Sequence, residues 1–598
     1  MDAPTIDKDA IRAKYAEERA KRLRDDGNSQ YQRMEGQFSD YATDPHTPVT
    51  PREPLTDHVT FAFIGGGFAG LVTGARVTEA GIKDVRIIEK GGDFGGTWYW
   101  NRYPGAQCDT AAMIYLPLLE ETGHMPSEKY VHGPEIRQHC KRIADQYGLY
   151  DNALFHTEVT DLEWQEDRSC WLIRTNRGDA FTAKYLGLGT GPLHVAKLPG
   201  IPGIEDFKGE AFHTSRWNYD YTGGDADGAP MANLADKRVA IIGTGATAVQ
   251  CVPHLAKAAK NLFVFQRTPS SIDERGNGPI DPDWFKEIAT PGWQQRWFDN
   301  FVDNQSQGMP AEDYVMDGWT ELSRRIREKV LSLPPTQWTP ETVMQAFEDA
   351  DFEKMSEIRA RCEDVVEDKK TAANLKAWYR QLCKRPCFHD AYLQAYNEPG
   401  TTLVHTDGKG VERITETGLI ANGEHYEVDC IIYASGFEVG SEYHELTGFD
   451  PVGRGEQKLS ELWEDGMRTF QGVHVHGFPN MFMVQPSQAA NLISNVPHNI
   501  VDHAETISTI IKHAEQVGAQ TVEPDLAAQN AWVDMILSGE GMLIGSTECT
   551  PGYYNNEGAG ITDRNRHGLG HPAGAKAFFA HIRAWRSSGA FEGLEFST

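Results

Sequence analysis

Long apolar runs and an excess of positive charge are both missing from this chain of 598 residues. No stretch reaches the roughly 20 apolar residues that a membrane-spanning helix needs. Asp and Glu outnumber Lys and Arg by 86 to 57, which gives a formal charge of -29. Such a surface repels nucleic-acid phosphates and anionic membranes, so we expect neither as a partner. The first 26 residues are charged and lack the apolar core of a signal peptide, and we therefore expect a cytoplasmic protein.

Cysteine is sparse and shows no paired pattern. The nine cysteines are an odd number, they are scattered along the chain, and no two have CxxC spacing. This distribution predicts reduced thiols rather than a disulfide framework. We interpret Cys383 and Cys387, four residues apart, as structural, and we expect no metal site. The length allows three or four domains, or two large interleaved ones.

The first chemical motif is a glycine-rich turn. A short apolar strand at residues 61–64 leads into a GxGxxG turn formed by Gly65, Gly67 and Gly70, and a helix and a second strand ending at Glu89 follow. These glycines permit a tight turn, close approach of a pyrophosphate and helix–strand packing, and the helix N-terminus favours the phosphate charge. The acidic strand end can accept hydrogen bonds from a ribose without a 2′-phosphate, which predicts an FAD site. The alternative is a purely structural glycine turn.

A second copy of this layout begins at Gly243 and continues with Gly245 and Ala248. The first glycine and the strand end are equally far apart in both copies (89 − 65 = 24 and 267 − 243 = 24), but here the strand ends in Arg267. A cation suits a 2′-phosphate, so the second copy predicts an NADPH site. The alternative is a solvated strand end. The sequence QRTP, which includes Thr268, resembles the corresponding stretch of NADPH-using flavin monooxygenases.

The sequence GGTWYWNRYPGAQCD at residues 95–109 separates several classes of flavoprotein. Pyridine-nucleotide disulfide reductases are similar as far as Gly96 and Thr97, and then need a pair of redox cysteines. Trp98 stands where that pair would begin, and only Cys108 follows. Reduced flavin must therefore react with another acceptor, for which oxygen is the natural candidate.

The segment between the two glycine-rich turns carries the most telling resemblance. Phe207, Gly209, His213 and Trp217 match the fingerprint of Baeyer–Villiger monooxygenases, although Asn218 stands where that family usually has Pro or Asp. The earlier stretch also resembles a longer pattern of the same family, through Gly95, Gly96, Trp98, Tyr103, Pro104, Gly105 and Asp109.

The resemblance implies roles for particular side chains. In LCKRPCF, it makes Arg385 the catalytic arginine and Lys384 a partner of Arg267 at the 2′-phosphate, although two cations there could also be a solvated loop. A guanidinium is always charged and can stabilise both an anionic oxygen nucleophile and the adduct that it forms with a carbonyl. Asp109 is expected to hold Arg385 by a charge-assisted hydrogen bond. His213 is expected to link the domains rather than transfer protons, or to be a buried hydrogen-bonding residue. The resemblance also assigns cofactor contacts to Gly96, Thr97, Trp98, Tyr103 and Asp109.

The implied fold is α/β, with two Rossmann-like dinucleotide-binding domains for FAD and NADPH, a helical insertion and an N-terminal arm. Alternating residues at 164–185 predict antiparallel strands. Residues 429–439 resemble the strand that returns to the FAD domain, and residues 477–497 resemble the segment that approaches the flavin. The arm could instead be a poorly ordered tail, and the insertion a packing lobe. The expected segments are an arm and strap (1–57), the first FAD part (58–195), the NADPH domain with the fingerprint linker (196–270), the insertion (271–380), the NADPH-domain return with the arginine loop (381–394), and the second FAD part with a mobile C-terminal loop (395–598).

The expected activity is NADPH- and O2-dependent insertion of one oxygen next to a ketone carbonyl, giving an ester or lactone. The long arm and the sequence YYNNEG at 553–558, where many members have Ser-Trp-Tyr, look closest to the cyclopentadecanone monooxygenase branch, so large cyclic or bulky ketones are the expected substrates. The alternatives are an N- or S-oxidising flavin monooxygenase and a flavoprotein that does not use oxygen. The oligomeric state is left open.

Overall fold

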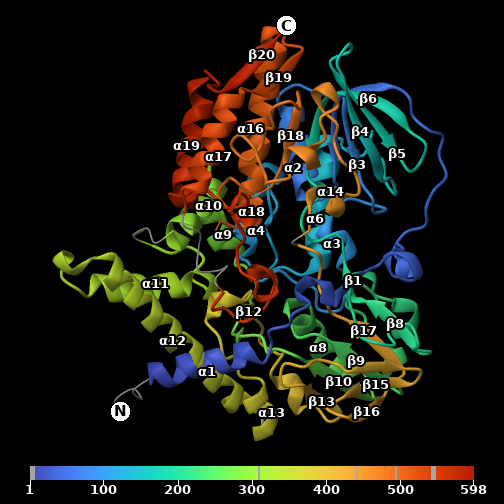
Figure 1. Cartoon of the computed structure of the whole chain (residues 1–598), viewed down its shortest axis with the longest axis vertical. Coiled ribbons are helices and arrows are strands. Elements are labelled where there is room, and N and C mark those ends of the chain that lie inside the picture. Colours follow the sequence, from blue (N-terminus) through green and yellow to red (C-terminus); the bar gives the residue numbers. More distant parts are fainter. Residues whose placement is uncertain are drawn as a thin grey trace.

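The computed structural model describes residues 7–306, 310, 312–439, 441–485, 487–491, 494–539 and 547–598, except for the side chain of Asp40. Two β-sheets with flanking helices lie one above the other in Figure 1, and the helical insertion projects to one side. No helix among the described residues is long and apolar enough to cross a membrane.

The first sheet has the order β3-β2-β6-β5-β4, with β18 beside β6. Strands β2, β3, β6 and β18 run parallel, whereas β4, β5 and β6 form the expected antiparallel meander. The strands are β2 (His58–Ile64), β3 (Val85–Ile88), β4 (Val159–Gln165), β5 (Cys170–Thr175), β6 (Ala180–Leu188) and β18 (Met481–Met483). Thus β18 is the strand that returns to this sheet, within the stretch 477–497, of which positions 486, 492 and 493 lie outside the described residues.

The second sheet has the order β13-β10-β9-β17-β8, and all its neighbouring strands are parallel. Its strands are β8 (Glu210–His213), β9 (Arg238–Ile242), β10 (Asn261–Gln266), β13 (Thr401–His405) and β17 (Cys430–Tyr433). The fingerprint segment therefore supplies an edge strand, β8, rather than only a linker.

One prediction about this topology is wrong. We expected residues after 395 to belong to the FAD domain and residues 429–439 to supply its returning strand. Instead β13 pairs with β10, and β17 pairs with β8 and β9, so the second sheet extends to residue 433. A parallel strand buried on both faces is apolar throughout, so its sequence does not show which of two similar sheets it joins.

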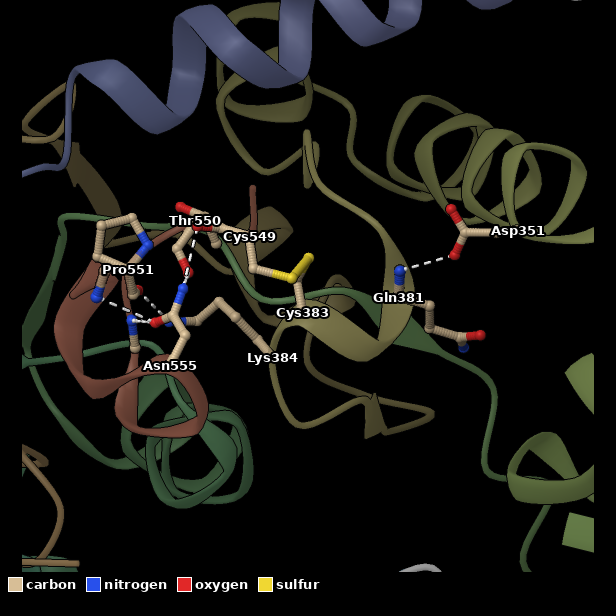
Figure 2. Close-up of a disulfide and its surroundings, with 10 residues drawn as sticks. Asp351, Gln381, Cys383, Lys384, Cys549, Thr550, Pro551 and Asn555 are labelled. Atoms are coloured by element: carbon tan, nitrogen blue, oxygen red, sulfur yellow. Dashed lines mark hydrogen bonds between the residues drawn. A yellow bond between two sulfur atoms is a disulfide. The ribbon is translucent and has the colours of Figure 1, made fainter. Parts of the chain in front are cut away.

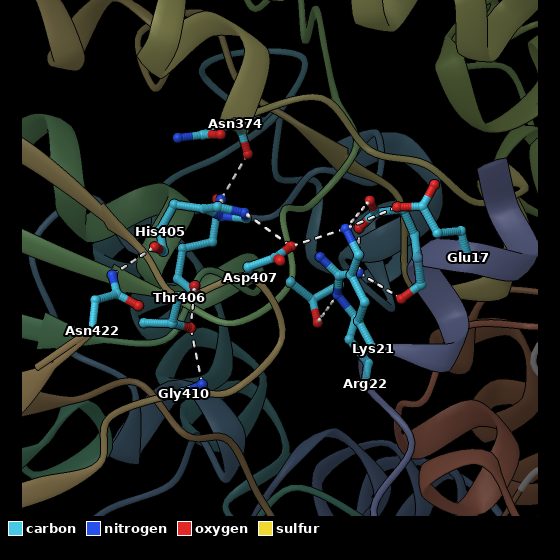
Figure 3. Close-up of polar contacts among 12 residues, drawn as sticks. Glu17, Lys21, Arg22, Asn374, His405, Thr406, Asp407, Gly410 and Asn422 are labelled. Atoms are coloured by element: carbon cyan, nitrogen blue, oxygen red, sulfur yellow. Dashed lines mark hydrogen bonds and ion pairs between the residues drawn. The ribbon is translucent and has the colours of Figure 1, made fainter.

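The N-terminal arm packs on the body of the protein. Helix α1 (Lys8–Ala20) lies beside α12 (Pro340–Val365) of the insertion, where Arg12 forms an ion pair of 2.6 Å with Glu348. At the end of α1, Lys21 bonds Asp407, which lies in the turn after β13 (3.1 Å; Figure 3). The short strand β1 (Tyr31–Arg33) then pairs antiparallel with β7 (Lys197–Pro199). The arm thus runs past the carboxyl ends of β10 and β13, where parallel α/β sheets commonly bind ligands.

The insertion is helical, as expected. It contains α9 (Pro282–Ile288), α10 (Trp293–Gln305), α11 (Gly318–Leu331), α12 and α13 (Lys369–Asn374). Trp293 and Trp297 of α10 are buried in the same apolar core as the helices of the first sheet. The insertion is therefore joined to both halves of the molecule, because it leaves the chain between strands of the second sheet.

The other elements cover the sheets or form small hairpins. They are helices α2 (Phe68–Glu79), α3 (Thr97–Trp100), α4 (Ala112–Tyr115), α5 (Leu119–Thr122), α6 (Gly133–Tyr147), α7 (Tyr219–Thr222), α8 (Ala246–Ala258), α14 (Tyr443–Thr447), α15 (Leu459–Leu462), α16 (Val496–Val517), α17 (Leu526–Leu537), α18 (Asp563–Arg566) and α19 (Gly574–Ser588), and strands β11 (Ile272–Asp273), β12 (Cys387–Phe388), β14 (Arg413–Thr415), β15 (Gly418–Ala421), β16 (Glu424–Glu427), β19 (Thr521–Pro524) and β20 (Leu594–Ser597).

Candidate active site

A bidentate ion pair joins Arg385 to Asp109. The arginine Nη1 donates to Asp109 Oδ2 at 2.7 Å, and Nη2 donates to Oδ1 at 2.6 Å. The Asp109 side chain is 4% exposed, whereas that of Arg385 is 32% exposed. Burial opposes the charge of Arg385, but the Asp109 carboxylate outweighs it and holds the pKa of the guanidinium well above its usual value. The predicted contact is present, and it fixes a permanent positive charge that remains open on one side.

Trp319, from α11 of the insertion, supports both members of this pair. Its indole N–H donates to the Asp109 carbonyl oxygen at 2.8 Å, and the Arg385 guanidinium lies 5.5 Å from the centre of its ring. The insertion contains several tryptophans, but no spacing along the chain connects this one with the arginine. The contact shows that the insertion reaches the candidate site.

The first glycine-rich turn has the backbone geometry of a dinucleotide site. A Cβ on Gly65, whose φ is +112°, would lie 2.4 Å from the Gly189 carbonyl oxygen, and one on Gly70 would lie 2.1 Å from the Gly65 carbonyl oxygen. Helix α2 starts at Gly67 without a side-chain cap, so its first N–H groups keep no side-chain acceptor there. A phosphate is the group that fits such a helix start.

Glu89 closes this turn from the end of β3. Its carboxylate accepts backbone N–H groups of Gly66 and Gly91, both at 2.6 Å. The side chain is 6% exposed, and burial raises the pKa of its carboxyl, opposed by those two N–H groups. The structure thus places Glu89 against the glycine turn.

The stretch at residues 95–109 runs from the first glycine-rich turn toward α8, the helix that follows the second turn. Thr97 and Trp98 open α3, and the Trp98 indole N–H donates to the Tyr115 hydroxyl at 2.8 Å. Further on, the buried Tyr103 hydroxyl donates to Gln250 of α8 at 2.9 Å. Gly96 lies against Gly67, where a Cβ on Gly96 would be 2.7 Å from the Gly67 Cα. Gly96 of this stretch therefore contacts the first glycine-rich turn, and Tyr103 contacts the helix that follows the second turn.

The second turn repeats the first. A Cβ on Gly243, whose φ is +115°, would lie 2.5 Å from the Ala434 carbonyl oxygen, whereas one on Gly245 would meet open space. Helix α8 begins at Gly245 without a side-chain cap, and Ala248 is fully buried in its first turn. The turn thus has the same uncapped helix start as the first and fits a second phosphate group.

Arg267 and Lys384 lie close to one anionic side chain of the C-terminal loop. Arg267 Nη2 is 3.6 Å from Glu557 Oε2, and Lys384 Nζ donates to the Pro551 carbonyl oxygen at 3.3 Å. Burial lowers the pKa of Lys384 to about 8; nearby Glu557 opposes this shift, and Arg267 adds to it. Thr268, next to Arg267, accepts a bond from Thr244 of the second turn through its carbonyl oxygen (2.6 Å). The predicted 2′-phosphate residues therefore meet beside the second turn.

The fingerprint residues lie at the edge of the second sheet, where His213 and Trp217 are buried, Phe207 is half-buried and Gly209 is exposed. His213 is fully enclosed, and its Nδ1 bonds the Ser215 hydroxyl at 2.8 Å. Burial, with a smaller contribution from Arg216, lowers the pKa of His213 to about 3, so the ring is neutral. Trp217 is 1% exposed, and a Cβ on Gly209 would lie 2.5 Å from the ring of Phe207.

Arg216, within the fingerprint, joins this segment to α3 and to the N-terminal strap. Its guanidinium lies 3.7 Å from the centre of the Trp100 ring, and its Nε donates to the Ala42 carbonyl oxygen in the strap (3.3 Å). The sequence motif did not mark this arginine, because the family fingerprint leaves its position open.

The expectation of reduced thiols is wrong for two cysteines. Cys383 and Cys549 form a disulfide across 166 residues of sequence, and Figure 2 shows it between the arginine loop and the C-terminal loop. The remaining seven cysteines are buried free thiols, including Cys387. Spacing along a sequence reveals only pairs that are close in the chain, so it could not show this one. The bridge ties the residue before Lys384 to the loop that contacts it.

The C-terminal loop at 549–560 is organised by Asn555. Its side-chain oxygen accepts the backbone N–H groups of Gly552 (3.0 Å) and Gly558 (3.1 Å), and its side-chain nitrogen donates to the Cys549 carbonyl oxygen (3.1 Å; Figure 2). Burial raises the pKa of Tyr554, and the nearby Arg385 charge opposes that shift. This loop therefore lies beside the catalytic candidate, where the family's Ser-Trp-Tyr segment is expected.

Comparisons with known proteins agree with this arrangement. The pattern of the family described as pyridine nucleotide-disulphide oxidoreductase matches residues 62–290. The neopentalenolactone D synthase of Streptomyces avermitilis is 47% identical over 596 residues, covering 99% of both chains. A Baeyer–Villiger monooxygenase of Streptomyces coelicolor is 45% identical and covers 96% of this chain and 95% of its own.

Solved structures give the same result. The polycyclic ketone monooxygenase of Thermothelomyces thermophila superposes with a TM-score of 0.91 at 36% identity, over 99% of both chains. A steroid monooxygenase bound to NADP reaches a TM-score of 0.73 at 27% identity, over 90% of this chain and 99% of that one. The conclusion rests on two dinucleotide turns with uncapped helix starts, an arginine fixed by Asp109, and relatives that match over nearly the full length. This chain belongs to the Baeyer–Villiger monooxygenases, FAD- and NADPH-dependent enzymes that oxidise ketones to esters or lactones.

Proposed function

We propose that this enzyme oxidises bulky cyclic or polycyclic ketones, with Arg385 as the catalytic residue and Asp109 as the residue that positions it. The overall reaction consumes a ketone, O2, NADPH and a proton, and releases the ester or lactone, NADP+ and water. FAD, when bound and reduced, supplies the oxygen chemistry. The protein's own contribution is to bind, orient and stabilise charge.

The bidentate pair between Arg385 and Asp109 carries this proposal. A guanidinium held by both nitrogens cannot rotate freely, so its unshared face keeps one direction. Negative charge on the attacking oxygen, and then on the carbonyl oxygen, is stabilised by such a preorganised donor without reorganisation during the reaction. A lysine at this place would offer a charge without the planar fork.

The two sheets divide the cofactors between them in this proposal. The first turn, with Gly65, Gly67 and Glu89, takes FAD, because an acid at the strand end suits a ribose without a 2′-phosphate. The second turn takes NADPH, with Arg267 and Lys384 on its 2′-phosphate. His213, neutral and buried, acts between the sheets and transfers no proton. Phe207, Gly209 and Trp217 shape the same segment.

The preference for bulky ketones rests on relatives. The polycyclic ketone monooxygenase matches this chain over 99% of its length. The assignment to a large-ring branch and the cytoplasmic location remain predictions. The net charge of -29 continues to argue against nucleic acid or an anionic membrane as a partner.

Substrate-dependent NADPH consumption with product analysis tests the proposal. The FAD-loaded enzyme would be given cyclopentadecanone, a steroid ketone, cyclohexanone and a tertiary amine, and products would be identified by mass spectrometry. We expect a lactone carrying one added oxygen from a large or fused ring, and less from cyclohexanone. Exclusive oxidation of the amine would refute ketone oxidation, and a preference for cyclohexanone would refute the bulky substrate class.

A further inference from the structure

Four cations gather where the N-terminal arm crosses the C-terminal loop. Arg267 and Lys384 are joined there by Lys197 of β7, which is 6% exposed, and by Arg22 of the arm, which is 5% exposed. Arg22 Nε donates to the Thr268 hydroxyl at 3.1 Å. Figure 3 shows Arg22 beside Lys21, which anchors the arm to Asp407. Arg22 pairs with Glu18 of α1 at 2.6 Å, so the other three cations call for a further anion.

Glu557 supplies that negative charge in this structure. The residue is 6% exposed, its Oε1 accepts the Tyr31 hydroxyl at 3.4 Å, and its Oε2 lies 3.6 Å from Arg267 Nη2. Burial lowers the pKa of both Lys384 and Lys197, and nearby Glu557 opposes that shift in each. Yet Oε2 has no hydrogen-bond partner among the residues that the structure describes. Arg267 donates instead to the Gln30 side-chain oxygen and to the Tyr31 hydroxyl, and Lys384 donates to the Pro551 carbonyl oxygen. These cations therefore bond neutral oxygens although a carboxylate lies close by.

The backbone that carries Glu557 is in a conformation that side chains disfavour. Asn556 and Glu557 have φ of +52° and +53°, two successive left-handed residues of which neither is glycine. Asn556 is also held by Asn28 of the arm, whose side-chain nitrogen donates to its side-chain oxygen at 2.5 Å. Such strain persists only where the surroundings hold it, and it is released when that hold is lost.

We infer that Glu557 is an internal stand-in for the 2′-phosphate of NADPH, which the phosphate must displace from Arg267 and Lys384 on binding. This inference rests on the proposed assignment of those two cations to the 2′-phosphate. A phosphate has three strong acceptor oxygens and carries more charge than one carboxylate, so it can replace the neutral oxygens that Arg267 and Lys384 now bond. NADH has no such group and leaves Glu557 in place. Glu557 is therefore a residue that determines cofactor specificity.

Displacement of Glu557 would also reach the catalytic arginine. The same loop contains Tyr554, where the Arg385 charge opposes the burial that raises the pKa of the hydroxyl. The disulfide between Cys549 and Cys383 also ties this loop to a position two residues before that arginine. Binding of the correct cofactor would therefore alter the wall of the site in which the ketone is oxidised. Binding energy at the phosphate is thereby coupled to a conformational change at a distance.

The test uses full-length, FAD-loaded enzyme and two nucleotides that differ in one phosphate: adenosine 2′,5′-bisphosphate and adenosine 5′-monophosphate. Affinities would be measured by calorimetry for the wild type and Glu557→Gln. We expect the variant to bind the bisphosphate about fivefold more tightly, because one competing ion pair is gone, and the monophosphate unchanged. Glu445→Gln, which removes an equal charge paired with Arg33 of the arm, is the matched control and should change neither affinity.

Hydrogen exchange of residues 552–560 gives a second measurement. In the wild type, the bisphosphate should speed exchange of these amides and the monophosphate should not, while Glu557→Gln should exchange faster without any nucleotide. Tyr31→Phe removes a hydroxyl that donates to Glu557 and accepts from Arg267, so it should speed the exchange of these amides by a smaller amount.

Two failures can be told apart. If the wild type prefers the bisphosphate but Glu557→Gln binds it no better, or binds it more weakly, the stand-in role is overturned while the phosphate site survives. If the wild type binds both nucleotides equally, the assignment of Arg267 and Lys384 to the 2′-phosphate is overturned, and the role of Glu557 with it.

Discussion

Replacing Asp109 by Asn should separate the reduction of the flavin from the oxidation of the ketone. The amide keeps the shape of the carboxylate, but it can accept only through one oxygen and turns an NH2 group toward the guanidinium. One of the two bonds to Arg385, at 2.6 and 2.7 Å, is therefore lost. The arginine keeps its charge but no longer keeps one direction.

The size of the effect follows from the kind of bond that is lost. A hydrogen bond between charged groups contributes about 1.5–3 kcal/mol, and about 1.4 kcal/mol corresponds to a tenfold change in rate. Ester formation should therefore fall by about 10- to 150-fold. Global stability should change less, because Arg385 is 32% exposed and water can solvate part of the freed charge.

Stopped-flow absorbance of the flavin and gas chromatography of the ester measure the two halves of the reaction separately. Asp109→Asn should reduce its flavin with NADPH at close to the normal rate, form little ester and release hydrogen peroxide instead. Arg385→Ala should abolish the ester, and Arg385→Lys should recover only part of it because an ammonium lacks the planar fork. Normal ester yield from Asp109→Asn would refute the positioning role, and normal yield from Arg385→Ala would refute the catalytic assignment.

Three further changes test other contacts of the same region. Because burial lowers the pKa of Lys384 to about 8, its ammonium is lost as pH rises through that value, so KM for NADPH should increase above about pH 8; Lys384→Arg should flatten the profile, and a wild-type profile without this rise would contradict the reasoning. Trp319→Phe keeps the ring beside Arg385 but loses the donor to the Asp109 carbonyl oxygen, so the ester yield per NADPH should fall about fivefold, as for about 1 kcal/mol; unchanged coupling would show that the bond is dispensable. Replacing Cys383 and Cys549 together by Ser should lower the free energy of unfolding by about 2–4 kcal/mol in denaturant titrations and raise KM for NADPH; identical unfolding curves with and without reductant in the wild type would argue that no disulfide forms.

Local patterns in the sequence predicted local structure well. Each glycine-rich turn was expected between a strand and a helix, and β2 with α2, and β9 with α8, have that order. The reason is physical: the first glycine of each turn is needed because a Cβ would overlap a backbone carbonyl oxygen, as at Gly65 and Gly243. Such constraints act within about 30 residues and can be read from one chain.

Features that depend on distant pairing could not be predicted in this way. The apolar strand β17 was assigned to the wrong sheet, since either parallel sheet would bury it equally well. The disulfide joins residues 166 apart, and Trp319 meets Asp109 across 210 residues. Each of these contacts depends on how separate segments fold onto one another, and no spacing or composition encodes that.

The loop that holds Lys384 and Arg385 explains why those missed contacts matter together. The N-terminal arm reaches its surroundings through Arg22, the insertion through Trp319, and the C-terminal loop through Pro551 and the disulfide. In the part of the chain that the structure describes, none of these three segments contributes a strand to either of the two large sheets. A single flexible loop would let the Arg385 guanidinium adopt several rotamers. Ordering the side chain during the reaction would then cost conformational entropy. The added segments therefore do more than shape access for a bulky ketone: they contact the loop that carries two neighbouring cations, one proposed for the cofactor phosphate and one for the reacting oxygen.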